Sequence, residues 1–129
     1  MKGKTIPIYN MVFTVYQLKL VGDKHYFGTT PTWRKEIRLG EHRDGGGSKW
    51  TALFPPIEEN PVVETWSFGY GKKKEAYAFE NKKCEEFLTL HGIDSTRGGL
   101  QNYGKPGGYR WWVRGHLRHL VPVAYDWNS

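Results

Sequence analysis

The segment Lys73–His91 constrains the fold most, because it carries the clearest helical pattern in the chain. At about 100° per residue, its apolar side chains fall on one arc and its charged side chains fall on the opposite side. Gly92 follows it, and glycine commonly ends a helix. We therefore expect a long amphipathic helix with one face in the core. Its apolar arc comprises Ala76, Tyr77, Phe79, Cys84, Phe87, Leu88 and Leu90.

Glu80 lies in the middle of this apolar arc. An unpaired carboxylate is costly to bury, so Glu80 is expected to meet a cation, a hydrogen-bond donor or a metal ion. A salt bridge to an arginine or lysine at the edge of the core would explain the position, and so would a metal site. The pattern alone leaves both interpretations open.

A β-hairpin is predicted near the N-terminus. Residues 11–21 are rich in Val, Phe, Tyr and Leu without helical periodicity, and residues 24–29 follow as a partner strand. Tyr16 and Tyr26 lie one in each strand. A two-residue loop would place the two tyrosines on opposite faces of the sheet, whereas a three-residue loop or a bulge would place them on the same face.

Four further elements follow from local patterns. Apolar and polar side chains alternate along Val62–Phe68, which predicts a third strand. A helix is predicted over residues 30–43, because Thr30 can cap a helix and Pro31 is tolerated at its first position. Residues 45–51 are predicted to form a flexible, glycine-rich loop. A second amphipathic pattern predicts a basic and aromatic helix over about residues 109–121.

Several basic and aromatic side chains are candidates for contacting a polyanion. Arg34 and Arg38 share one side of the predicted helix, beside a core-facing stripe with Trp33 and Ile37, and could frame a phosphate. Lys49 and Trp50 end a loop that could approach a sugar-phosphate backbone. A solvated flank and a plain linker explain these features equally simply. Arginines also recur every four residues in the predicted C-terminal helix. They could contact phosphates or simply form a solvated helix face: Arg110, Arg114 and Arg118.

Composition narrows the function classes. The chain of 129 residues fits one domain, and its net charge of +6 with 16% aromatic residues suits a partner such as nucleic acid. Cys84 is the single cysteine, so an intramolecular disulfide is excluded and a cytoplasmic location is expected. No secretory signal pattern and no apolar stretch long enough to cross a membrane is present, so no membrane partner is expected.

Two short motifs resemble those that name the GIY-YIG nuclease superfamily. Thr14-Val15-Tyr16 stands ten residues before Tyr26-Phe27-Gly28, with Thr14 in place of the usual glycine and Phe27 in place of the usual isoleucine. The resemblance covers residues 14 to about 99, within a motif core of about 11–99 in one domain of residues 1–129. It continues through residues 38–42, 45–51, 75–76, Glu80 and 92–99.

The resemblance implies an α/β (α+β) fold with a small three-stranded antiparallel sheet flanked by helices. It also implies an endonuclease that hydrolyses DNA phosphodiester bonds with one divalent ion, Mg²⁺ or Mn²⁺, bound by Glu80. Tyr16 would act as general base or orient the water, and nearby positive charge would have to lower its pKa. Tyr26 would position the reacting groups, and Arg38 would stabilise the transition state.

Other roles also follow from the resemblance. His42 would hydrogen-bond a tyrosine or assist proton transfer, or else only cap a helix. Because the gap from Tyr26 to Arg38 is two residues longer than usual, Arg34 is the alternative candidate for the role of Arg38, and the sequence leaves both open. Gly28 and Ser95 would support the site, and Ser95 stands where asparagine is common.

The partner implied is DNA, either a specific sequence or a branched structure. Selectivity would come from the basic side chains, from a homodimer or from a partner protein. The alternatives are a non-catalytic basic nucleic-acid-binding module and an adaptor that uses exposed tryptophans. The predicted DNA-contacting residues are Arg34, Lys49, Trp50, Arg97, Arg110, Arg114 and Arg118.

Overall fold

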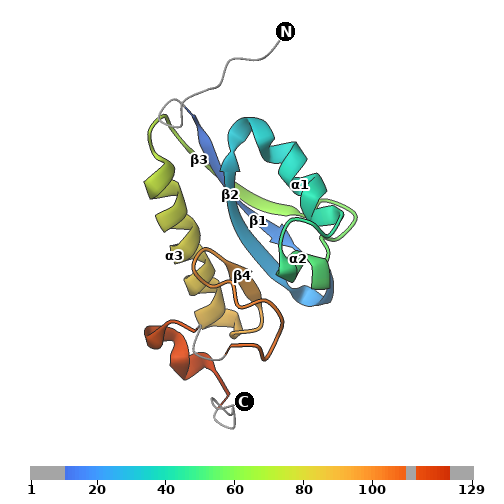
Figure 1. The fold of residues 1–129 in the computed structure, drawn as a ribbon, viewed down its shortest axis with the longest axis vertical. Helices are drawn as coiled ribbons and strands as arrows, with labels where there is room; N and C mark the ends of the chain where they lie inside the picture. Colours follow the sequence, from blue (N-terminus) through green and yellow to red (C-terminus); the bar gives the residue numbers. More distant parts are fainter. Residues whose placement is uncertain (1–10, 110–112, 123–129) are drawn as a thin grey trace.

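The computed structural model describes residues 11–109 and 113–122, and within them the fold is α+β (Figure 1). One open sheet contains four strands in the order β3-β1-β2-β4. The elements in chain order are β1 (Phe13–Lys19), η2 (Val21–Asp23), β2 (His25–Pro31), η3 (Thr32–Arg34), α1 (Lys35–Arg43), α2 (Lys49–Leu53), β3 (Val62–Phe68), α3 (Lys73–His91), β4 (Thr96–Gly98) and η5 (Gly115–Leu120), where η marks a 3₁₀ helix.

The sheet differs from the predicted three antiparallel strands. β1 pairs antiparallel with both β2 and β3, as expected, but β4 adds a fourth strand that is parallel to β2. The sheet is therefore mixed. A strand of three residues carries too little alternation to be recognised in the sequence, and its pairing with β2 is fixed by tertiary contacts.

The hairpin has the longer of the two turns considered. Tyr16 pairs with Gly28 and Leu18 pairs with Tyr26, so both tyrosines lie on one face of the sheet. The turn is the three-residue 3₁₀ segment Val21–Asp23, in which Gly22 has a φ of 72° and Asp23 has a φ of 57°. The geometric condition for a shared tyrosine site is met.

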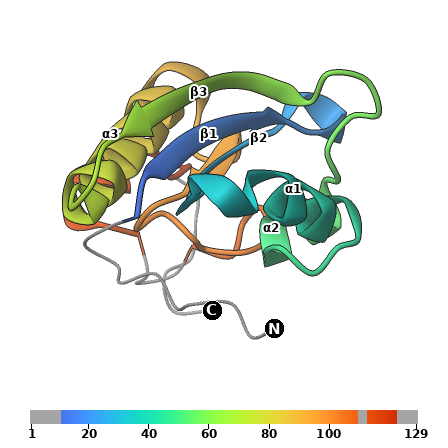
Figure 2. The same cartoon turned by 90° about the horizontal axis from the view of Figure 1, so that it is seen from above.

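The two faces of the sheet are covered by different helices (Figure 2). α3 packs on one face, where its Ala76 shares a buried cluster with Phe13 and Val15. α1 and α2 lie on the other face, where Trp50 of α2 packs with Leu18 of β1 and with both tyrosines. Tyr16 and Tyr26 therefore belong to the face covered by α1 and α2.

The helix predictions have mixed outcomes. α3 has the predicted bounds, although Tyr77 and Leu90 of its expected apolar arc are exposed. The helix predicted from Thr30 is wrong in its start, because Thr30 and Pro31 pair with β1 as the last residues of β2. α1 begins only at Lys35.

Other predicted segments also differ. Trp33 and Ile37 do not face the core, with 62% and 52% of their surface exposed. The predicted 45–51 loop ends in α2, because the Ser48 side chain accepts a hydrogen bond from the Thr51 amide and caps the helix. A helix was expected over residues 109–121. In the described part of that segment, residues 113–122 form only η5, a 3₁₀ helix of six residues. Among the described residues, no helix is long and apolar enough to cross a membrane.

Candidate active site

A polar pocket of about 300 Å³ opens at the edge of β2, just past the last residue that pairs with β4. Tyr16 and Tyr26 enter it from the sheet, Arg38 from α1 and Glu80 from α3. We call this space, in which predicted catalytic side chains meet, the catalytic pocket. Four of the five predicted catalytic side chains therefore line one space, although they are spread over 65 positions of the sequence from 16 to 80. Its other lining residues are Thr29, Tyr77, Asn81, Gly99, Leu100 and Asn102.

His42, the fifth predicted residue, lies directly behind Tyr16. Its Nε2 atom is 2.8 Å from Tyr16 Oη, and its Nδ1 atom is 2.9 Å from Thr51 Oγ1. Thr51 is held in turn by Ser48, whose Oγ lies 2.9 Å from Thr51 Oγ1. The imidazole is fully buried and packs against the ring of Tyr26 at a centroid distance of 4.8 Å.

Burial, followed by the positive charge of Arg38, lowers the pKa of His42 to about 4. His42 is therefore a neutral imidazole near pH 7, with one ring nitrogen donating and the other accepting. The expectation that His42 hydrogen-bonds a tyrosine is confirmed, and it does more than cap a helix end.

Arg38 is the arginine that the fold directs toward the tyrosines. Its guanidinium donates to Glu41 at 3.3 Å and to the Gly47 carbonyl oxygen at 2.9 Å. Arg34 instead pairs with the other carboxylate oxygen of Glu41 at 3.2 Å and does not line the catalytic pocket. Of the two arginines considered for the site, Arg38 is therefore the one that lines the pocket.

Tyr16 does not have the lowered pKa that a tyrosine base would need. Burial raises the pKa of Tyr16 well above its usual value, and the opposing effect of Arg38 is smaller. Burial also raises the pKa of Tyr26 to about 12. Both phenols are protonated at neutral pH, so Tyr16 cannot act as a free phenolate.

Glu80 is buried and lines the pocket. Burial raises the pKa of its carboxyl group to about 7, while Thr29, the Gly99 amide and Arg38 oppose this shift. Thr29 Oγ1 lies near enough to the Glu80 carboxyl group to favour its charged form. Among the described residues, however, Thr29 Oγ1 makes no hydrogen bond of normal geometry. The described part of the chain also gives Glu80 no salt bridge within 4.0 Å.

The residues of the catalytic pocket suit a weakly held Mg²⁺ or Mn²⁺ ion. The described residues contain no group of three His, Cys, Asp or Glu side chains that could enclose a metal. Mg²⁺ commonly binds through one or two carboxylates and keeps several waters and substrate phosphate oxygens as ligands. Glu80, with the Thr29 hydroxyl beside it, fits that mode of binding.

Two glycines, Gly28 and Gly47, leave room for the side chains of Tyr16 and His42. A Cβ at Gly28 would lie 2.3 Å from Tyr16 Oη, because the tyrosine ring crosses β2 at the residue with which it pairs. A Cβ at Gly47 would lie 2.3 Å from His42 Nδ1. The supporting role predicted for Gly28 therefore has a steric cause.

Substitution of Gly28 by alanine is expected to displace the Tyr16 hydroxyl from His42. If the chain has the nuclease activity that the resemblance implies, we expect a loss of about 100-fold in turnover, because a shift of about 1 Å in a reacting group has an effect of that size. The measurement is the rate of DNA cleavage together with the free energy of unfolding. Gly40→Ala is the control, since a Cβ there would meet no atom within 4 Å. Equal activity of the two variants would contradict the steric role.

Two predicted DNA-contacting residues are not available on the surface. Trp50 is fully buried, and its indole nitrogen donates to the His25 carbonyl oxygen. Arg97 is also fully buried, with its guanidinium 4.2 Å from the centre of the Trp50 ring and in an ion pair with Asp94 at 3.2 Å. Both residues are part of the core between α2 and β4, which corrects their assignment.

The remaining predicted residues lie elsewhere. Lys49, Arg114 and Arg118 are exposed, and Arg110 lies outside the described residues. Ser95 supports the fold: its hydroxyl donates to the Gly92 carbonyl oxygen at 2.6 Å, and its own carbonyl oxygen accepts from the His25 amide.

Sequence reasoning missed residues that complete the pocket. Thr51 fixes the His42 ring, and the Asn81 side chain accepts from the Leu100 amide at 3.0 Å, which ties the turn after β4 to α3. Asn102 lies on the pocket rim. The one sequence signal for these residues was that Asn81 directly follows Glu80.

Comparisons of this chain with models of known protein families, with curated proteins and with solved structures found no match.

Proposed function

We propose that this protein is a metal-dependent endonuclease of the GIY-YIG kind that hydrolyses phosphodiester bonds in DNA. The observation that carries the proposal is the convergence of Tyr16, Tyr26, Arg38 and Glu80 on one pocket, with His42 bonded behind Tyr16. Each of these side chains was predicted from the resemblance in sequence. A basic, aromatic-rich chain is also suited to a nucleic-acid substrate.

Phosphate binding falls to Arg38. Its guanidinium is held by Glu41 and by the Gly47 carbonyl oxygen, so it is oriented before substrate arrives. A fixed guanidinium beside a phosphate stabilises the charge that develops in the transition state. Glu80 would hold the divalent ion, which when bound polarises a phosphate oxygen.

Proton transfer falls to Tyr16 and His42. Because Tyr16 is protonated, it accepts a proton from the attacking water only while giving its own proton to His42 Nε2, 2.8 Å away. The water oxygen bonds to phosphorus as the bond from phosphorus to the leaving oxygen breaks. With a pKa of about 4, His42 holds its extra proton only briefly, and the proton passes through solvent to the leaving oxygen. This path needs the tautomer in which His42 donates from Nδ1 to Thr51 Oγ1, and the 2.9 Å separation of those atoms permits it. Tyr26, also protonated, donates to a phosphate oxygen in the same pocket.

The test is cleavage of plasmid and branched DNA by the purified chain, with Mg²⁺ or with a chelator. We expect strand scission with Mg²⁺, and none with the chelator. A non-catalytic binding module would instead show salt-sensitive binding that does not depend on metal, with no scission under any divalent ion. That second pattern would contradict the proposal.

A further inference from the structure

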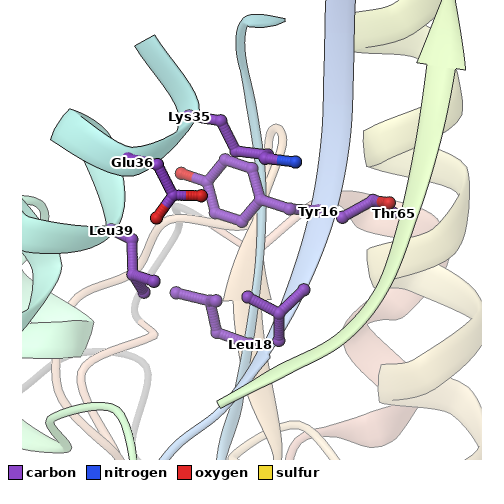
Figure 3. A pocket seen from close by; sticks show the side chains of 7 residues that line it. Tyr16, Leu18, Lys35, Glu36, Leu39 and Thr65 are labelled. Carbon is purple, nitrogen blue, oxygen red and sulfur yellow. The ribbon is translucent and has the colours of Figure 1, made fainter. Parts of the chain in front are cut away.

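A second pocket, of about 280 Å³, adjoins the catalytic pocket and shares Tyr16 with it (Figure 3). It lies between α1 and the sheet, on the same face as both tyrosines. Two cross-strand pairs form its floor, because Tyr16 pairs with Thr65 and Leu18 pairs with Val62. We call this space the side pocket.

The lining of the side pocket combines apolar surface with a few polar groups. Leu18, Leu39 and Val62 supply aliphatic walls, and the Tyr16 ring supplies an aromatic one. Figure 3 shows the Glu36 carboxylate and the Lys35 ammonium group reaching from α1 toward the Tyr16 ring. Apolar walls with few polar groups are typical of small-molecule sites, and a volume near 300 Å³ lies at the small end of their range.

A nucleobase matches this lining better than a phosphate does. Glu36 would repel a phosphate, whereas a carboxylate accepts hydrogen bonds from the exocyclic amino group of a base. An ammonium group such as that of Lys35 donates to base carbonyl or ring nitrogen atoms. Tyr16 is largely buried, and the part of its ring that lines the pocket offers an aromatic contact to a base.

Tyr16 joins the two pockets, with its hydroxyl beside His42 and its ring lining the side pocket. A nucleotide whose phosphate lies beside Arg38 therefore has an apolar pocket on the other side of Tyr16. A base in a duplex stack does not reach such a pocket, because enzymes that bind a base in a pocket take it out of the stack.

We propose that the side pocket binds an unpaired base next to the scissile phosphate, so that the substrate is DNA with an unpaired nucleotide, such as a bulge, a flap or a single strand. This inference rests on the proposed nuclease function. Unstacking is least costly for a base that is already unpaired, so such substrates would be selected without sequence-specific contacts.

The first measurement uses binding alone. The probe is a duplex with one bulged 2-aminopurine, mixed with the Glu80→Gln protein so that the strand stays intact. We expect the fluorescence of the bulged 2-aminopurine to change on binding, while a duplex with a fully paired 2-aminopurine shows no such change. Equal responses from the two duplexes would overturn the inference.

The second measurement removes the base. At the unpaired position beside the mapped cleavage site, adenine is compared with an abasic nucleotide. We expect affinity and cleavage by the wild-type chain to fall roughly tenfold without the base, in line with the usual effect of losing one base stack. An unchanged rate and affinity would contradict a base in the side pocket.

Two matched variants locate the effect. Val62→Trp fills the side pocket and is expected to abolish the preference for the base, whereas Val63→Trp, at an exposed neighbour that does not line it, retains the preference. Glu36→Gln, a milder change at an exposed residue, is expected to weaken the preference without altering the fold. A preference that survives Val62→Trp in a folded protein would overturn the inference.

The two proposals fail in different ways. If no substrate is cleaved with Mg²⁺ but the bulged 2-aminopurine still responds and the response is lost in Val62→Trp, the nuclease proposal fails and the base site stands. If bulged and fully paired duplexes are cleaved equally, and with or without the base, the nuclease proposal stands and the base site fails.

Discussion

Glu80→Gln is expected to abolish metal-dependent cleavage and to stabilise the folded protein at the same time. The amide cannot supply the negative charge that holds a divalent ion, so we expect the cleavage rate to fall by at least ~10³-fold. The stability gain arises because a buried carboxylate is costly to ionise. A gain in stability with a loss of activity is the usual mark of a functional residue in an unfavourable environment.

The stability effect depends on pH with a definite sign. The pKa of Glu80 rises from 4.5 to about 7 on folding, so between these values the folded chain binds more protons than the unfolded chain. Its contribution to stability is present below about pH 4.5 and is lost as the pH rises through about 7. Glu80→Gln is therefore expected to add on the order of 3 kcal/mol above pH 7 and little at low pH.

Thermal unfolding near pH 5 and near pH 8 measures this effect. Glu86→Gln is the matched control, because Glu86 is an exposed carboxylate on the same helix. It is expected to change neither cleavage nor the pH dependence of stability. Undiminished cleavage by clean Glu80→Gln protein would remove Glu80 from the site.

Arg38→Ala is expected to slow cleavage by about 10²- to 10³-fold, while Arg34→Ala changes it only a few-fold. Removing one preorganised donor to the transition state has an effect of the larger size. The two arginines share Glu41 as a partner and lie four residues apart, Arg34 at the end of η3 and Arg38 in α1, so they form a matched pair. Only Arg38 lines the pocket with Tyr16 and Glu80.

Single-turnover rates on one DNA substrate separate the two arginines. Arg38→Lys is expected to fall between wild type and Arg38→Ala, because lysine keeps the charge but loses the planar fork that also binds the Gly47 carbonyl oxygen. Both ion pairs are partly exposed and contribute little to stability, so unfolding should change only slightly. A larger effect from Arg34→Ala would show that the wrong arginine has been assigned.

The predictable parts of the fold were those with strong local periodicity. The bounds of α3 follow from an apolar pattern with a period of 3.6 residues, and those of β3 from a period of two residues. The helical pattern also identifies Glu80 as a carboxylate on the buried face of α3. The hairpin was predictable as an element, but its turn length was not. That length was decided by Gly22 and Asp23, which both adopt positive φ in a three-residue turn.

The parts that could not be predicted depend on tertiary contacts. Thr30-Pro31 is suited to a helix start and equally to a strand end, and pairing with Phe13 and Thr14 decides for the strand. Arg97 resembles a surface cation in sequence, yet it is buried against Trp50 with Asp94 as its partner. Thr51 belonged to the segment that resembles the family, but its hydrogen bond with His42 was not predictable, because that contact exists only once α2 has folded.

The most direct test of Glu80 as the metal ligand is the pH dependence of Mn²⁺ binding, followed by electron paramagnetic resonance on the wild-type chain and on Glu80→Gln. A proton on Glu80 competes with the ion, and the pKa of Glu80 is about 7. We expect the Mn²⁺ affinity of the wild-type chain to rise about tenfold per pH unit below 7 and to level off above it. Glu80→Gln should lose this binding at every pH. Binding that is independent of pH, or that persists in Glu80→Gln, would contradict a metal site at Glu80.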